Sequence, residues 1–228
     1  VDVPKGYDAQ NDQTLRRIKL TLTPPTMDDQ RDDWSRLEKA LRQQTGIDDI
    51  SVSLPVLQRI GVALREGDWQ VTALVAFDAA PTSDSTRTGA LIDLKPGHVS
   101  DEEPQWGISI DIGTTTVSVW LVDLISGEVV AQTAEYNRQI RRGEDVISRV
   151  IYAGKNKGQS ELRDLVLTSI NTLIDRACDK AFSKRKAAVS ENGSDPQGCT
   201  PADIVKATIV GNSIMMHLLL GIPAESIR

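Results

Sequence analysis

Cysteine is scarce in this sequence of 228 residues, which contains only Cys178 and Cys199. Two thiols cannot build a disulfide framework, and by themselves they cannot complete the ligand set of an iron–sulfur cluster or a structural zinc ion. Long apolar runs are also lacking, since no segment approaches the roughly 20 apolar residues that cross a membrane as a helix. The first residues do not resemble a signal peptide. These absences predict a cytoplasmic protein without a membrane-spanning segment.

An excess of positive charge is missing as well. The chain has 32 Asp and Glu residues against 26 Lys and Arg residues, which gives a net charge of −6. Proteins that coat nucleic acid or an anionic membrane need a basic face, so we expect neither a nucleic-acid nor a membrane partner. The short basic run at 184–186 follows a predicted helix end, where cations are favourable. The apolar content of 39% is typical of a globular protein with a core.

Residues 1–25 are predicted to form a linker or arm, and residues 26–97 a small α/β domain. Within the arm, apolar residues alternate along LRRIKLTL and stop at Pro24-Pro25, which is typical of a strand. The following domain mixes helical and alternating patterns, without a cluster of catalytic residue types, so we expect it to serve packing or docking. Its predicted elements are a helix that Gly46 ends, a strand over 50–54, a helix over 55–66, and strands over 69–77 and 89–95.

A boundary follows in KPGHVSDEEPQW, which combines proline, glycine and acidic residues without apolar periodicity. His98 lies in this boundary and is predicted to be an exposed loop residue. Residues 105–228 then give the order β-β-β-α-α-β-α, so the whole chain is predicted to have an α/β (α+β) fold. The predicted strands cover 107–112, 116–123, 128–136 and 203–211, and the predicted helices cover 144–153, 160–182 and 213–221.

The stretch D-I-G-T-T-T, which begins at Asp111, joins the first two of these strands. Gly113 lets a phosphate approach the backbone, whose successive N–H groups can form an anion-binding concavity. Thr114, Thr115 and Thr116 add hydroxyl donors. Asp111 would repel a bare phosphate, so it indicates a Mg²⁺ ion that binds together with a nucleotide, through water. The alternative is that the threonines are ordinary strand residues and Gly113 marks a bulge.

Glu144 and Asp145 stand at the start of the helix predicted over 144–153, whose apolar residues include Ile147 and Ile151. Acidic residues at a helix N-terminus are favourable by about 0.3–1 kcal/mol each. That placement by itself accounts for the pair, and a functional role is the alternative.

The turn at Gly211 and Asn212 leads from an apolar strand into a helix, a place where the helix N–H groups of such folds meet ligands. Asn212 can serve as the N-cap and contact a phosphate at once. His217 lies on an apolar helix and is predicted to be a packed histidine with one hydrogen bond rather than a ligand. Cys178 is predicted to be a small core residue, whereas Cys199 lies in a polar loop, where a thiol can be reactive.

The D-x-G-T-T hairpin of a β-β-β-α unit resembles the first phosphate loop of the superfamily of actin, sugar kinases and heat-shock chaperone ATPases. Two longer segments, NRQIRRGEDVISRV (137–150) and IVGNSIMMHLLLGIP (209–223), resemble one branch of it, the ATP-dependent reductive activators of corrinoid proteins. This resemblance covers residues 105–228 and implies that they are the N-terminal, incomplete part of a ribonuclease-H-like ATPase domain. The preceding residues resemble the linker and middle domains of that family in layout.

The resemblance implies an activity. Corrinoid activators use ATP and Mg²⁺ to return cobalt from Co(II) to Co(I) on a corrinoid protein of a methyltransferase system, in anaerobic metabolism. The electron comes from an iron–sulfur centre, often a plant-type [2Fe–2S] module, and this chain has no C-x4-C-x2-C run that could hold one. We therefore expect a central piece of a longer polypeptide that is inactive alone. Family members also suggest a homodimer.

The resemblance further implies roles for the candidate residues. Asp111 would hold Mg²⁺ through water, while the backbone and hydroxyls from Gly113 to Thr116 and the turn at Gly211 and Asn212 would bind the phosphates. Glu144 and Asp145 would join Asp111 as catalytic residues that face the nucleotide cleft or the corrinoid partner.

Two alternatives remain open at this stage. A small-molecule kinase of the same superfamily would need a catalytic base, for which Glu144 or Asp145 is the candidate, and no redox partner. A docking module without catalysis would bind a partner through residues 26–95 and keep the hairpin as a vestige.

Overall fold

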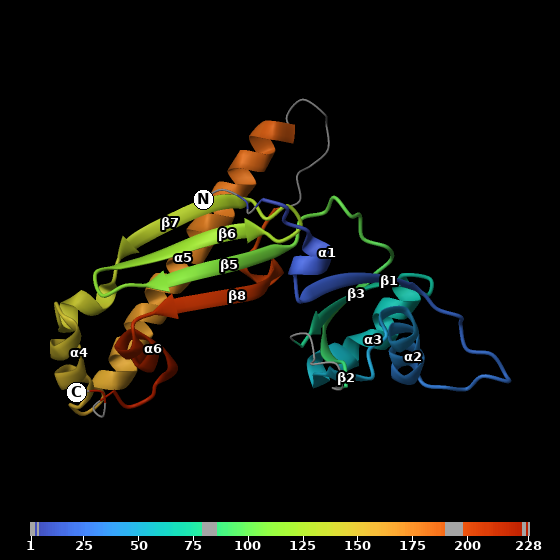
Figure 1. Cartoon of the computed structure of the whole chain (residues 1–228), viewed down its shortest axis with the longest axis horizontal. Helices are drawn as coiled ribbons and strands as arrows, with labels where there is room; N and C mark the ends of the chain where they lie inside the picture. Colours follow the sequence, from blue (N-terminus) through green and yellow to red (C-terminus); the bar gives the residue numbers. More distant parts are fainter. Residues whose placement is uncertain (1–2, 4, 79–85, 190–197, 225–226, 228) are drawn as a thin grey trace. The chain divides into compact units, whose positions relative to one another are not determined.

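The computed structural model describes the chain apart from residues 1–2, 4, 79–85, 190–197, 225–226 and 228 (Figure 1). It divides into an N-terminal unit, Gly6–Pro104, and a C-terminal unit made of Gln105–Arg228 with Val1–Lys5. Each unit has its own four-stranded sheet and its own hydrophobic core. Within the described part of the chain, none of the helices is both long and apolar enough to span a membrane. The predicted α/β fold class is confirmed.

The sheet of the N-terminal unit has the strand order β1-β3-β4-β2. Strands β1, β3 and β4 pair antiparallel, and β2 pairs parallel with β4. The elements are α1 (Ala9–Asp12), β1 (Leu15–Thr21), α2 (Asp33–Thr45), β2 (Asp49–Val52), α3 (Leu54–Glu66), β3 (Gln70–Phe77) and β4 (Thr88–Pro96).

Helix α2 begins and ends where its capping residues predict. The Asp32 carboxylate accepts a hydrogen bond from the Ser35 N–H (2.9 Å), which satisfies one of the free amides of the first turn. Gly46 has a φ of 68° and closes the helix in the left-handed region, where glycine is favoured. Between these caps Leu37 and Leu41 are fully buried against the sheet, so a single apolar stripe fixes the helix on the core.

Strand β1 belongs to the sheet of the N-terminal unit, although the sequence placed it in an arm before the domain. It pairs with β3 from Leu15↔Ala76 to Thr21↔Gln70, so the unit begins at Gly6 rather than at residue 26. Pairing between such distant segments leaves no trace in a local pattern. His98 lies in the predicted exposed loop, where Nε2 is 3.1 Å from the Leu20 carbonyl oxygen.

The C-terminal unit follows the predicted order β-β-β-α-α-β-α, with a short 3₁₀ helix, η1, inserted after the third strand and another, η2, before the fourth. Its sheet has the order β7-β6-β5-β8, in which only β8 runs parallel to its neighbour. The elements are β5 (Trp106–Ile112), β6 (Thr116–Asp123), β7 (Val129–Tyr136), η1 (Arg138–Arg142), α4 (Val146–Ala153), α5 (Gly158–Val189), η2 (Pro201–Asp203), β8 (Ile204–Gly211) and α6 (Ser213–Leu220).

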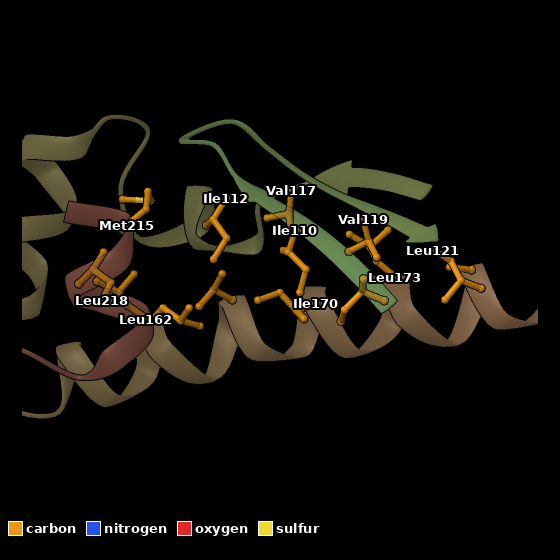
Figure 2. Close-up of a cluster of buried hydrophobic side chains, with 14 of the residues drawn as sticks. Ile110, Ile112, Val117, Val119, Leu121, Leu162, Ile170, Leu173, Met215 and Leu218 are labelled. Carbon is orange, nitrogen blue, oxygen red and sulfur yellow. The ribbon is translucent and has the colours of Figure 1, made fainter. Parts of the chain in front are cut away.

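Helix α5, which has 32 residues, covers one face of this sheet (Figure 1). Figure 2 shows the inward side chains of β5 and β6 meeting those of α5. The alternation along each strand and the spacing of three or four along the helix place these residues in one core. Its central members are Ile110, Ile112, Val117, Val119, Leu121, Leu162, Ile170, Leu173, Met215 and Leu218.

Helix α4 turns two of its apolar residues to solvent. Ile147 and Ile151 are 58% and 46% exposed. Arg149, Val150 and Ala153 are buried instead. The apolar residues of α4 come as two adjacent pairs, 146–147 and 150–151, and these are compatible with more than one buried face. The contacts of Arg149 described below decide which face turns inward.

Two isoleucines in helices provide a matched test of this core. We expect Ile170→Ala, at a buried position of α5, to lower the free energy of unfolding by about 2–5 kcal/mol, because it removes packed methyl groups and leaves a cavity. Ile147→Ala, at the exposed position of α4, should change it by about 0.5 kcal/mol or less. Urea denaturation measures both, and equal losses would contradict the orientation of α4.

Candidate functional site

The candidate site is the tip of the β5–β6 hairpin, between Ile112 and Thr116. Gly113 donates its N–H to the Thr116 carbonyl (2.9 Å), which closes the turn tightly. A Cβ atom at Gly113 would lie 2.7 Å from that carbonyl oxygen, closer than real Cβ contacts occur. The pairing of β5 with β6 from Trp106 to Ile112 has no irregularity, so Gly113 serves the tight tip and is not a bulge.

The carbonyl groups of the tip are bound by the rest of the unit. The Asn137 side chain donates to the Gly113 carbonyl (2.9 Å), the Arg149 guanidinium to the Thr114 carbonyl (2.6 Å), and the Asn137 N–H to the Thr115 carbonyl (2.8 Å). In a planar trans peptide the next N–H points opposite to its carbonyl. The amides of Thr114, Thr115 and Thr116 each point away from the group that binds the preceding carbonyl.

A buried polar network lies behind the tip. Asn137, Gln139 and Arg149 are each exposed by 1% or less. Gln139 accepts from Arg149 Nη1 (3.2 Å) and donates to the Leu162 carbonyl of α5 (2.9 Å). Arg149 Nη1 also lies 3.2 Å from Met215 Sδ of α6. The network thus fixes the hairpin tip to η1, α4, α5 and α6 together.

The β8–α6 turn lies beside the tip. Asn212 caps α6, because its Oδ1 accepts from the Met215 N–H (3.0 Å), and its Nδ2 donates to Thr114 Oγ1 (3.3 Å). A Cβ atom at Gly211 would lie 3.0 Å from the Ile112 carbonyl oxygen, so the turn packs closely against the end of β5. The structure therefore brings Gly211 and Asn212 to the hairpin tip.

Asp111 is exposed on the face of β5 opposite the core, between Ser118 of β6 and Val210 of β8. An exposed carboxylate next to an anion-binding loop can hold a hydrated cation that arrives with a phosphate. Over the described parts of the chain, no three or more His, Cys, Asp or Glu side chains are grouped as a metal site. A cation beside Asp111 would thus find no second or third carboxylate grouped with it in this part of the chain.

Glu144 and Asp145 take different positions at the start of α4. Asp145 is the N-cap, and its Oδ1 accepts from the Ser148 N–H (2.8 Å) in a capping box that Ser148 completes. Glu144 is exposed in the preceding turn. The arrangement accounts for Asp145 by helix capping, and the contact of α4 with the tip is made by Arg149 instead.

Replacing Asp145 can separate the contribution of its helix cap from that of its charge. We expect Asp145→Ala to lower the free energy of unfolding by about 0.5–2 kcal/mol, since it removes the cap of α4. Asp145→Asn keeps a capping oxygen without the charge and should remain within about 0.5 kcal/mol of the parent protein. Chemical denaturation measures the stabilities, and an unstable Asp145→Asn variant would show that the charge matters more than the cap.

The remaining candidates are His217 and the two cysteines of the C-terminal unit. His217 is half-buried, with Nδ1 2.7 Å from the Ser213 carbonyl oxygen, as expected for a packed histidine. Cys178 is buried as predicted. Cys199, predicted to lie in a polar loop, is buried as well, with its Sγ 3.3 Å from Cys178 Sγ. Its hydrogen bond to Cys178 and its burial both raise the pKa of Cys199, while that hydrogen bond lowers the pKa of Cys178.

The two thiols should react slowly in the folded protein. Burial blocks access to both sulfurs, and the raised pKa of Cys199 keeps it protonated at neutral pH. We expect alkylation by iodoacetamide, followed by mass spectrometry, to be at least ten times slower in buffer than in denaturant for both cysteines. Rapid labelling of Cys199 in the native state would contradict its buried position.

Sequence reasoning missed the residues that hold the tip from behind, namely Asn137, Gln139, Arg149 and Met215. Three of them lie in the segment 137–150, which stood out as a motif but not residue by residue. One signal was available, since an arginine among the apolar residues of a short helix is costly to bury and needs several acceptors.

Together, these contacts describe a C-terminal α/β unit whose hairpin tip is held by a buried polar network. Comparison with known families is consistent with the two units: residues 106–228 match the RACo middle region, and residues 7–101 match the RACo linker region. The chain therefore belongs to the RACo family.

Two relatives extend this comparison. Over 131 residues, or 57% of this chain, it is 34% identical to the corrinoid activation enzyme RamQ of Eubacterium limosum. A solved structure described as a reductive activator for corrinoid, iron-sulfur protein superposes over 95% of the chain with 35% identity and a TM-score of 0.73. The chain spans only 19% of the length of RamQ and 31% of that structure.

Proposed function

We propose that this chain is the linker and the first part of the ATPase domain of a reductive activator of corrinoid proteins. In the complete protein, ATP drives the return of Co(II) to Co(I) on a corrinoid protein, with an electron from an iron–sulfur centre outside this chain. The observation that carries the proposal is the hairpin tip, where Asn137 and Arg149 bind the carbonyls of Gly113 and Thr114, so the amides of Thr114 and Thr115 point away from these two partners. The RACo family match supports the same assignment.

The residues at the tip fit Mg–ATP. The amides and hydroxyls of Thr114, Thr115 and Thr116 would bind phosphate oxygens, and Gly113 leaves the turn narrow enough for close approach. Asp111 would hold Mg²⁺ through water. When bound, ATP supplies the free energy of a conformational change; moving a two-state protein from 1:99 to 99:1 takes about 5.5 kcal/mol of differential affinity.

The residues of this chain do not fit an iron–sulfur cluster. A [2Fe–2S] centre of the ferredoxin type needs four thiolates, and the sequence contains two cysteines. Both lie in the core of the C-terminal unit, with their sulfurs in contact. The electron would therefore reach the cobalt from a cluster elsewhere in the complete protein.

The partner proposed for the complete protein is a corrinoid protein of a methyltransferase system. The names of both relatives refer to corrinoid activation, and each is more than 30% identical to this chain over the aligned part. The kinase alternative gains no support from the site, since Asp145 caps α4 and Glu144 lies exposed in a turn.

Two substitutions at the tip test this proposal in the complete protein. We expect Asp111→Ala and Thr114→Val each to lower the rate of ATP-dependent Co(I) formation by about ten-fold or more, because a hydrogen bond to a charged group contributes about 1.5–3 kcal/mol. Reduction of the iron–sulfur centre by a chemical reductant should be unchanged. Anaerobic absorption spectroscopy follows cobalt and cluster separately.

Thr168→Val is the matched control, because Thr168 is an exposed threonine of α5 whose hydroxyl donates only to the Asp164 carbonyl (2.7 Å). Its Co(I) formation rate should equal that of the parent protein. Full activity in both tip variants would mean that the hairpin does not bind the nucleotide phosphates.

A further inference from the structure

Arg149 is a buried cation directly beneath the hairpin tip. Its Nη2 donates to the Thr114 carbonyl (2.6 Å) and its Nε to the Gly143 carbonyl (2.9 Å). The acceptors next to Nη1 are the Gln139 amide oxygen and the Met215 sulfur, both at 3.2 Å. All four acceptors are neutral, so the positive charge is hydrogen-bonded without being neutralised by them.

A purely structural role leaves this charge unexplained. Burying an ion costs several kcal/mol, and replacing buried ions with apolar residues of similar volume is often neutral or stabilising. Burial lowers the pKa of Arg149, and the charge of Asp145 opposes that change. Asp145 is exposed and hydrogen-bonded to the start of α4, so water screens it from the guanidinium. Among the residues that the structure describes, no carboxylate forms an ion pair with this buried charge.

We propose that Arg149 is a positioning residue of the nucleotide site and that the bound polyphosphate is the counter-ion of its charge. The inference rests on the proposed function, since it requires the phosphates of ATP to lie at the hairpin tip. It goes further by assigning an electrostatic role to a residue that would never touch the nucleotide. The cation acts from behind the loop, through the backbone of Thr114 and Thr115.

The geometry provides a path for this action. Arg149 makes a charge-assisted hydrogen bond to the Thr114 carbonyl, and such bonds are stronger than neutral ones. The same peptide unit carries the N–H of Thr115 on its opposite side. Hydrogen bonds in a chain polarise one another in a low-dielectric interior. The guanidinium therefore makes the Thr115 amide a better donor and holds it toward an anion.

The test compares two ligands that differ in the phosphates. Dissociation constants for Mg–ATP and for AMP would be measured by calorimetry on the complete protein, because only Mg–ATP has the β- and γ-phosphates. We expect Arg149→Met to weaken Mg–ATP at least ten-fold and AMP less than two-fold. Arg149→Lys keeps the charge but cannot bond Thr114 and Gly143 together, so it should weaken Mg–ATP about three- to ten-fold, again selectively.

The matched control is Arg163→Met. Arg163 is an exposed arginine of α5 whose Nε donates to the Leu219 carbonyl of α6 (3.0 Å), so it also joins two elements through a neutral acceptor. Both dissociation constants should stay at their parent values in this variant. Circular dichroism would establish that each variant is folded, and Arg149→Lys carries the test if Arg149→Met does not fold.

The outcomes separate the two proposals. An unchanged ratio of the Mg–ATP and AMP dissociation constants in the folded Arg149 variants would overturn the role of Arg149, whether both ligands weaken or neither does. A parent protein that binds Mg–ATP no more tightly than AMP would overturn the phosphate site itself, and with it both proposals. Selective loss of Mg–ATP affinity in the Arg149 variants alone supports the inference.

Discussion

The hydrogen bonds that bind the carbonyl groups of the β5–β6 tip determine how this unit can act. A hairpin tip normally turns its polar groups to water, and either its carbonyls or its amides can face a ligand. Here Asn137 and Arg149 bind the carbonyls of Gly113, Thr114 and Thr115 from the protein side. Because the peptide unit is rigid, the amides must face the other way. The direction of these amides is thus set by the residues that bind the carbonyls.

The same bonds explain the arrangement of the surrounding helices. Arg149 can reach the Thr114 carbonyl only if α4 turns that residue inward, and this leaves Ile147 and Ile151 exposed. Asn212 caps α6 and donates to Thr114 Oγ1, so the start of α6 is fixed to the tip as well. A ligand that moved the tip would therefore move η1, α4 and α6 together. This is the kind of coupling that a nucleotide-driven conformational change needs.

Much of the fold was predictable because it depends on how apolar residues recur along short segments of the sequence. Alternation along β5 and β6 reproduced those strands closely, since burial on one face imposes the pattern directly on the sequence. Helix α5 was predicted over 160–182 but continues to Val189, so the basic run at 184–186 lies within the helix and not after its end. The membership of β1 in the N-terminal sheet was not predictable, because strand pairing depends on residues far along the chain. The 3₁₀ helix η1 was missed for a related reason, since so short an element has no apolar period.

The candidate site was likewise predictable only where a residue has a local cause. Gly113, the threonines, Gly211 and Asn212 could be found from sequence, because glycine at a tight turn and an amide side chain at a helix start have local causes. The supporting residues could not, since the partners of Asn137 and Arg149 come from other elements. Local reasoning also accounted for Asp145 by its cap but could not decide whether a charge there serves catalysis.

The charges around the tip favour a particular form of ligand. Asp111 presents an exposed carboxylate next to the amides of the tip, and Arg149 holds a buried cation beneath them. A bare polyphosphate would meet the repulsion of Asp111, and a bare Mg²⁺ ion would meet a single carboxylate close to a positive charge. The proposed magnesium–nucleotide complex would satisfy both groups at once, since the metal would contact the carboxylate through water and the phosphates would bind the amides. Selectivity for the complex over either component would then follow from the placement of two opposite charges, in a chain whose net charge of −6 would by itself disfavour anions.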